Sequence, residues 1–198
     1  MKLEYIEALG HFLAYYETDL KYFANFKKFR TGKLSFDDYF KKVDRSFSNF
    51  IAEFKVARNI PKNSQKEYLV KTMEWLNENP IAVSVDDFAE YMKQTTHGKV
   101  MTSLCSKVLM LNAPHLIIPI DTYGRNALDQ KVNQYSAYNQ KVRLFKTENQ
   151  KTIEELINKV IDYILEIENK FKDVLEHITE IRELRLTDKM LWCTGKKK

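Results

Sequence analysis

The sequence predicts an all-α fold of about seven or eight helices, and three observations support this prediction. Apolar residues recur at steps of three and four along most of the chain, which is the period of an α-helix. Only five glycines and four prolines occur in 198 residues, too few for a turn-rich β architecture. The composition is 44% hydrophobic and 30% charged, which is ordinary for a globular chain. We therefore expect a single all-α domain over residues 1–198.

The N-terminal helices, within residues 1–65, are predicted from their apolar stripes and their boundaries. A first helix is expected over 3–29, because apolar side chains from Ile6 to Phe23 follow helical steps. Ser35 stands where an N-cap is expected, and acidic residues follow it, so a second helix is predicted to run to about Arg58. Its phenylalanine-rich stripe is typical of a core.

The central region, residues 84–130, is predicted to contain three short helices. A helix over 65–78 ends before Pro80 and precedes this region. Ser84 is a candidate N-cap for the next helix, which is expected to end near His97 and Gly98. Further helices are expected over 100–112 and 121–128. The polar segment 129–150 gives no clear pattern and is interpreted as partly loop.

The C-terminal region is predicted to contain one long helix over 150–184, followed by a short helix and a basic tail. Apolar residues from Ile153 to Ile181 alternate steps of four and three, which is a heptad seam. Additional leucines and an isoleucine widen this stripe, which favours a bundle core over a two-stranded coiled coil. A homodimer through 153–181 remains the alternative interpretation.

Composition also limits the class of protein. No apolar run reaches the roughly 18–20 residues that a membrane span requires, and the charged N-terminus does not resemble a signal peptide. Cys105 and Cys193 form neither a disulfide framework nor a metal-binding spacing, so we expect a cytoplasmic protein without a metal or cofactor.

Positive charge is concentrated in one part of the chain. The net charge is +5, but the segment from Lys93 to Lys146 holds eight basic and two acidic residues. The rest of the chain has a slight acidic excess. A localised basic region is typical of phosphate binding, and the alternative is a solvated surface that happens to be basic.

The segment SKVLMLNAPHLIIPIDTYGR, residues 106–125, carries the most specific pattern in the sequence. Lys107 is expected at the edge of a helical apolar stripe, where its stem can be buried while its amine faces a cleft. Partial burial lowers the pKa of a lysine and makes its amine nucleophilic. The alternative is a surface lysine whose stem lies along apolar neighbours.

Asp121 follows a stiff apolar loop that contains Pro114 and Pro119, and the burial of residues 116–118 is expected to hold that loop. Its first expected role is to cap the helix that begins at Thr122. Capping leaves one carboxylate oxygen available for chemistry. Arg125, four residues later, is expected to steady the carboxylate or a phosphate, or simply to lie on the helix surface.

This order of residues resembles the helix-hairpin-helix DNA glycosylases that have a Gly/Pro-rich loop and a catalytic aspartate. The similar parts are a helix bearing Ser-Lys, an apolar connection, PIDTYGR, and the ending LRLTDKMLW. Tyr123 stands where the family usually has histidine, and HGK at 97–99 replaces its glycine-rich hairpin. The resemblance implies a multi-helix DNA-glycosylase-like fold and base excision on duplex DNA.

The resemblance also implies roles for individual residues. Lys107 would form a Schiff base with deoxyribose C1′, and Asp121 would assist departure of the base. An extruded base needs aromatic neighbours, and the candidates are more commonly core residues. The implied DNA contacts are His97, Gly98, Lys99, Arg125 and Lys131, and the implied base pocket contains Trp75, His115, Tyr123 and Trp192.

Two alternative functions remain open at this stage. The first is a nucleic-acid-binding module without catalysis, in which Lys107 contacts phosphate. The second is a helical interaction protein that dimerises through 153–181 and has no role on DNA.

Overall fold

The computed structural model describes residues 2–56, 58, 60–80 and 84–198, and all regular structure within these ranges is helical. The described residues form ten α-helices, somewhat more than the seven or eight expected, together with short 3-10 and π turns. None of the helices in these ranges is both long and apolar enough to cross a membrane.

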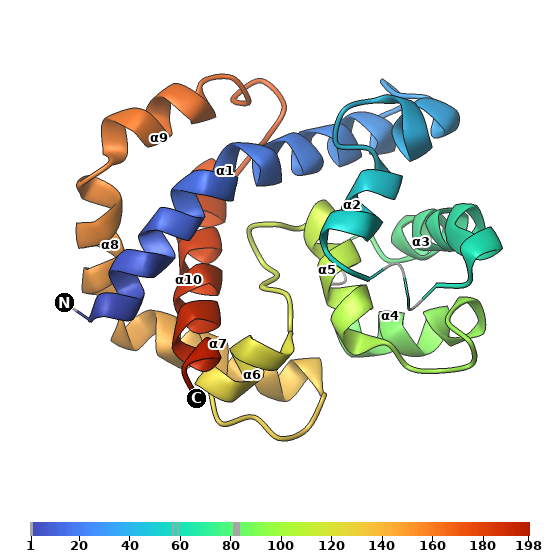
Figure 1. Ribbon diagram of the computed structural model, residues 1–198. Helices are drawn as coiled ribbons and strands as arrows, with labels where there is room; N and C mark the ends of the chain where they lie inside the picture. Colours follow the sequence, from blue (N-terminus) through green and yellow to red (C-terminus); the bar gives the residue numbers. More distant parts are fainter. Residues whose placement is uncertain (1, 57, 59, 81–83) are drawn as a thin grey trace.

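The helices form two groups that are joined by the first helix (Figure 1). Helix α1 (Leu3–Arg30) runs along both groups. The first group contains α2 (Phe47–Glu53), α3 (Gln65–Glu78), α4 (Val85–Tyr91) and α5 (Thr102–Asn112). The second contains α6 (Thr122–Ala127), α7 (Tyr135–Glu148), α8 (Gln150–Asn158), α9 (Ile161–Glu168) and α10 (Ile178–Lys196).

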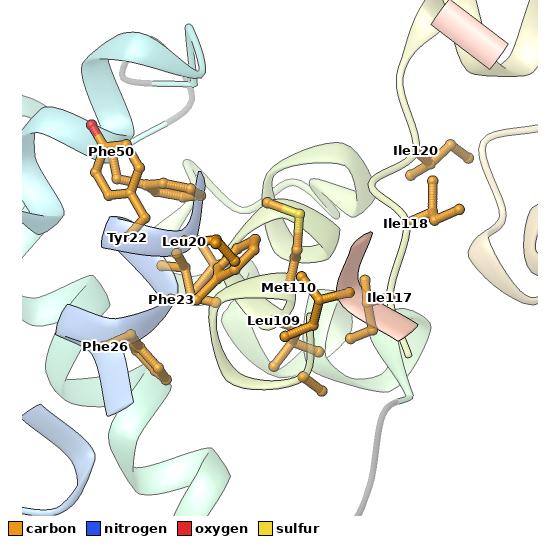
Figure 2. Packing of buried hydrophobic residues seen from close by; sticks show 14 of the residues in the cluster. Leu20, Tyr22, Phe23, Phe26, Phe50, Leu109, Met110, Ile117, Ile118 and Ile120 are labelled. Atoms are coloured by element: carbon orange, nitrogen blue, oxygen red, sulfur yellow. The ribbon is translucent and has the colours of Figure 1, made fainter. Parts of the chain in front are cut away.

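Helix α5 lies at the centre of the hydrophobic core. Eight of its eleven residues are buried, and it packs against α1 and α4. Figure 2 shows Phe23 of α1 facing Leu109 and Met110 of α5, with Ile117 of the following loop on the other side of that helix. The expected burial of residues 116–118 is confirmed for Ile117 and Ile118 but is wrong for Leu116, which is 48% exposed.

The N-terminal half confirms three of the expected helices and corrects the fourth. Helices α1 and α3 match the predicted ranges, and Ser84 caps α4 by accepting a hydrogen bond from the Asp87 N–H. The predicted helix over 35–58 is interrupted after a π turn over Asp38–Lys42. Arg45 then adopts a positive φ, and Ser46 and Asn49 form a capping box that starts α2. Side chains that bind nearby backbone groups thus begin a new helix within the predicted one.

The segment 129–150, which the sequence left unassigned, contains helix α7. Its first backbone N–H groups are satisfied from a distant part of the chain. The carboxylate of Asp86, in α4, accepts hydrogen bonds from the N–H groups of Tyr135 (2.8 Å) and Ser136 (2.9 Å). A cap supplied by another helix leaves no local signal in the sequence.

The predicted long helix over 150–184 is wrong, because this segment forms α8, α9, an irregular turn and the start of α10. A straight helix of that length would extend about 52 Å, longer than the helices it must cover. Breaks near Val160 and at His177, which has a positive φ, let the segment fold back around α1.

Residues of the apolar seam are buried in the core of the chain itself. Ile153, Ile164 and Ile181 are essentially fully buried. A buried hydrogen-bond network connects α9 to α10 across the irregular turn between them. Arg182 donates to the Glu168 carboxylate at 2.8 and 2.5 Å, and the Tyr16 hydroxyl donates to the same carboxylate at 2.6 Å. A homodimer through 153–181 would have to use the side chains that remain exposed there.

Candidate active site

Lys107 projects from α5 and lines a cleft between the two helix groups, together with Phe54 and Pro119. Its side chain is partly buried, and its Nζ donates a hydrogen bond to the backbone carbonyl of Phe54 at 3.3 Å. Phe54 ends α2, where the helix dipole favours a cation. Burial lowers the pKa of Lys107, and the nearby Asp121 opposes that shift. The expected edge position, with a buried stem and an amine facing a cleft, is confirmed.

The loop before Asp121 is tied to α5 one residue before Lys107. The Ile120 N–H donates a hydrogen bond to the Ser106 hydroxyl oxygen at 3.1 Å, and that hydroxyl donates to the Ser103 carbonyl at 3.0 Å. Ser106 and Ile120 directly precede Lys107 and Asp121 in the chain. This bridge therefore fixes the backbone of the two predicted catalytic residues relative to each other.

Asp121 caps α6, as the sequence predicts. Its Oδ1 accepts a hydrogen bond from the Gly124 N–H at 2.6 Å. Burial raises the pKa of Asp121, whereas the hydrogen bond from Gly124 and the charge of Lys107 lower it. The cap occupies one carboxylate oxygen, and the side chain also lines the cleft.

The structure thus brings Lys107 and Asp121 to one cleft of about 270 Å³. This volume lies just below the range of small-molecule sites, about 300–1,000 Å³. Helices α1, α2, α5 and α10 and the loop before α6 form its walls. Its lining residues are Tyr15, Thr18, Asp19, Glu53, Phe54, Lys107, Pro119, Asp121, Asp188, Lys189 and Trp192.

The acidic wall of the cleft is the part that sequence reasoning missed. Asp19 of α1 is 5% exposed, and burial raises its pKa while Lys189 and Arg185 lower it. Asp188 of α10 faces the same space and accepts a hydrogen bond from the fully buried Arg185 at 3.5 Å. The sequence does contain a signal for Asp19, namely an acidic residue within the apolar stripe of α1. That stripe is buried and includes Phe12, Tyr16 and Phe23.

Of the four aromatic residues predicted for a base pocket, only Trp192 lines the cleft. Tyr123 packs edge-on against Trp192 with ring centroids 5.4 Å apart, so it contacts a residue of the cleft without lining the cleft itself. Tyr15, 54% exposed, was not predicted and lies at the cleft.

Two of the predicted base-pocket residues lie elsewhere, which corrects their assignment. Trp75 packs in the α3–α4 layer against Phe88 and Tyr91, because it belongs to the apolar face of α3. His115 stacks on His177 with ring centroids 4.4 Å apart and lines a separate pocket near the end of α1, because the loop turns its side chain away from Asp121. Their proximity to the motif in the sequence did not predict the direction in which these two side chains point.

The turn at His97, Gly98 and Lys99 is exposed and precedes α5. Both His97 and Gly98 have a positive φ. The Gly98 N–H donates to the Lys93 carbonyl at 3.1 Å and the Lys99 N–H to the Thr96 carbonyl at 3.0 Å. These two N–H groups are therefore engaged inside the turn. A phosphate contact from either of these two residues would therefore have to use a side chain, such as that of Lys99.

Arg125 and Lys131 lie at the opposite end of α6 from Asp121. Arg125 donates to the Lys131 carbonyl at 3.2 Å, so it does not steady the Asp121 carboxylate by a hydrogen bond. Lys141 donates to the carbonyls of Leu128 and Asp129 in the same place. We call Arg125, Lys131, Lys141 and Lys198 the α6 basic cluster. It lies about 9 Å from Asp121 along the helix axis.

The chemistry available in the cleft is that of a partly desolvated amine beside several carboxylates. Such an arrangement can perform nucleophilic attack with proton transfer. Within the described ranges, the cleft holds no group of three side chains placed to bind one metal ion. Comparison of the chain with protein-family models, curated proteins and solved structures finds no match.

Proposed function

We propose that this protein is a DNA glycosylase-like enzyme that excises a base and forms a Schiff base through Lys107. The observation that supports the proposal is the shared cleft, since Lys107 and Asp121 both line it and a hydrogen-bonded bridge fixes their backbones. Burial lowers the pKa of Lys107 and so increases the fraction of neutral amine, the form that attack on carbon requires.

The reaction uses the two side chains in distinct roles. The Lys107 amine forms a bond to deoxyribose C1′ as the glycosidic C1′–N bond breaks, and the base leaves with that electron pair and takes up a proton. Asp121 stabilises the positive charge that develops at C1′ and accepts the first proton of the amine. Opening of the C1′–O4′ bond, with the second proton passing to O4′, gives the imine.

The remaining cleft residues suit an extruded base. The rings of Trp192 and Tyr15 offer stacking surfaces at the cleft. The carboxylates of Asp19 and Asp188 can accept hydrogen bonds from amino or ring N–H groups of a base. A base that presents several donors would therefore fit better than one that presents only acceptors.

The acidic lining also separates the base from the phosphates. The cleft contains four carboxylates, from Asp19, Glu53, Asp121 and Asp188, against two ammonium groups. Phosphates would be repelled there, so only the base and its sugar would enter. The duplex backbone would contact the α6 basic cluster and Lys99, which lie outside the cleft.

Borohydride trapping on a panel of duplexes tests the proposal. The panel carries oxidised, deaminated and abasic sites, and released base is measured in parallel. The variant Lys107→Gln is compared with Lys189→Gln, which removes the other cleft lysine. We expect wild type and Lys189→Gln to form a covalent adduct and Lys107→Gln to form none. An adduct of equal yield in Lys107→Gln, or none with any substrate including abasic DNA, would exclude the imine chemistry.

The α6 basic cluster supports a second candidate, a nucleic-acid-binding protein without catalysis. Its cations surround the carboxyl end of α6 and do not require the cleft. Because Lys107 lies in the cleft and not in this cluster, the phosphate contact that the sequence-based alternative gave to Lys107 passes here to the cluster. This candidate therefore predicts duplex binding that weakens steeply with salt, no released base, and unchanged affinity in Lys107→Gln. A loss of affinity in that variant equal to the loss on removing Lys131 would argue against it.

A further inference from the structure

Three metal-ligating side chains meet where the first and last helices pack against each other. Glu7 and His11 lie one turn apart on α1, and Cys193 faces them from α10. His11 Nε2 is 3.8 Å from Glu7 Oε1, and the ligand atoms of all three residues lie within 4.8 Å of one another. The Cys193 side chain is fully buried, whereas Glu7 and His11 are partly exposed.

We propose that Glu7, His11 and Cys193 bind a divalent transition-metal ion of the Zn²⁺ type. A thiolate, an imidazole and a carboxylate are ligands that Zn²⁺ and Co²⁺ accept together. Tetrahedral coordination at the usual bond lengths places such ligand atoms about 3.4–3.6 Å apart. Small side-chain rotations would bring the three atoms from their present separations to that geometry.

The charge and the access of the site also suit a cation. A thiolate and a carboxylate balance the charge of a divalent ion, so the bound site is neutral. The two partly exposed ligands give the ion a path from solvent, and a fourth position remains for water. Lys196 and Lys197, whose ammonium groups lie 4.0 and 3.8 Å from the Glu7 carboxylate, would have to release it. Both are exposed at the end of the chain and can do so at little cost.

The ion would join the two ends of the chain and stiffen one wall of the cleft. Helices α1 and α10 cross and pack against each other, and the same pair supplies Tyr15, Asp188 and Trp192 to the cleft. His11 packs edge-on against Trp192 with ring centroids 5.1 Å apart, so metal binding would also alter the surroundings of that indole. Sequence analysis did not predict this site, because its ligands come from opposite ends of the chain.

Titration of the full chain, without an affinity tag, with Co²⁺ tests the site. We expect one ion per chain and the absorption of a cobalt–thiolate bond, both removed by excess Zn²⁺. The matched control is Cys105→Ser, since Cys105 is buried beside Tyr68 and away from the cluster. The absorption should persist in Cys105→Ser and vanish in Cys193→Ser.

Two further variants test the site even if Cys193→Ser does not fold. Glu7→Gln and His11→Gln change partly exposed positions, so the fold should be retained, and each should weaken Co²⁺ binding at least tenfold. In a Trp75→Phe background, the fluorescence of Trp192 should change on binding. Absence of a thiolate absorption in the wild type, its persistence in Cys193→Ser, or unchanged affinity in His11→Gln would overturn the proposal. The metal site is independent of the imine chemistry, since its test measures binding alone.

Discussion

Replacing Asp121 by asparagine and by alanine separates its structural role from its chemical role. Asparagine keeps an oxygen that can accept the hydrogen bond from the Gly124 N–H at the start of α6, whereas alanine removes it. We expect Asp121→Ala to lose about 0.5–2 kcal/mol of stability, typical of a lost N-cap. For a chain of this size, each kcal/mol lowers Tm by about 2–4 °C. Asp121→Asn should melt at or above the temperature of the wild type.

The pH dependence of these melting curves gives the sign of the charge effect. Burial raises the pKa of Asp121 above its ordinary value of 3.8, so the folded chain holds this proton more tightly than the unfolded chain does. The wild type should therefore lose stability relative to Asp121→Asn as the pH rises from about 3.8 through the raised pKa, and the difference should then stay constant. Thermal unfolding followed by circular dichroism between pH 3 and 8 measures this difference.

The chemical role is measured on the same proteins by borohydride trapping. Asp121→Asn should lose at least about a hundredfold in trapping rate, because a neutral amide cannot stabilise positive charge at C1′ as a carboxylate does. Equal trapping by Asp121→Asn and the wild type would refute the catalytic role of Asp121. Equal stability of the asparagine and alanine variants would refute the capping role.

Four further changes have defined outcomes. Lys107→Met should stabilise the fold by about 0.5–2 kcal/mol at neutral pH, measured by urea unfolding. The reason is that burial lowers the pKa of this lysine, so its charged form destabilises the folded chain. The gain should shrink as the pH rises toward 10.5, because the lysine then loses its proton in the unfolded chain as well. Glu168→Ala leaves Arg182 buried without its partner and should cost about 3–5 kcal/mol in the same assay. Gly195→Ala should lower Tm, because a Cβ there would collide with the Tyr123 backbone and force α10 away from α6. Lys131→Ala should reduce the slope of log affinity against log salt for duplex DNA by about 1.

The sequence predicted those features whose causes are local. Helices α1, α3 and α5 follow from apolar periodicity, and the caps at Ser84 and Asp121 follow from residue type and position. In each case a side chain acts on backbone groups within a few residues, so the pattern can be recognised in one sequence. The position of Lys107 at the edge of an apolar stripe is of the same kind.

The features that the sequence did not predict depend on contacts between distant residues. The heptad seam over 153–181 gave the right buried positions for Ile153 and Ile164 but not the breaks that fold the segment around α1. Helix α7 begins where Asp86 caps it from another helix. The acidic wall of the cleft likewise combines Asp19 and Asp188 from helices at opposite ends of the chain. Only the packing of α1 against α10 brings them together.

Mapping the covalent bond between the protein and DNA tests the central claim most directly. Wild-type protein is incubated with a duplex containing an abasic site, reduced with borohydride and digested, and the modified peptide is identified by mass spectrometry. Our account predicts a sugar remnant on Lys107, which lies in the cleft with Asp121. A remnant on Lys189 or on the N-terminal amine, or no modified peptide at all, would contradict it.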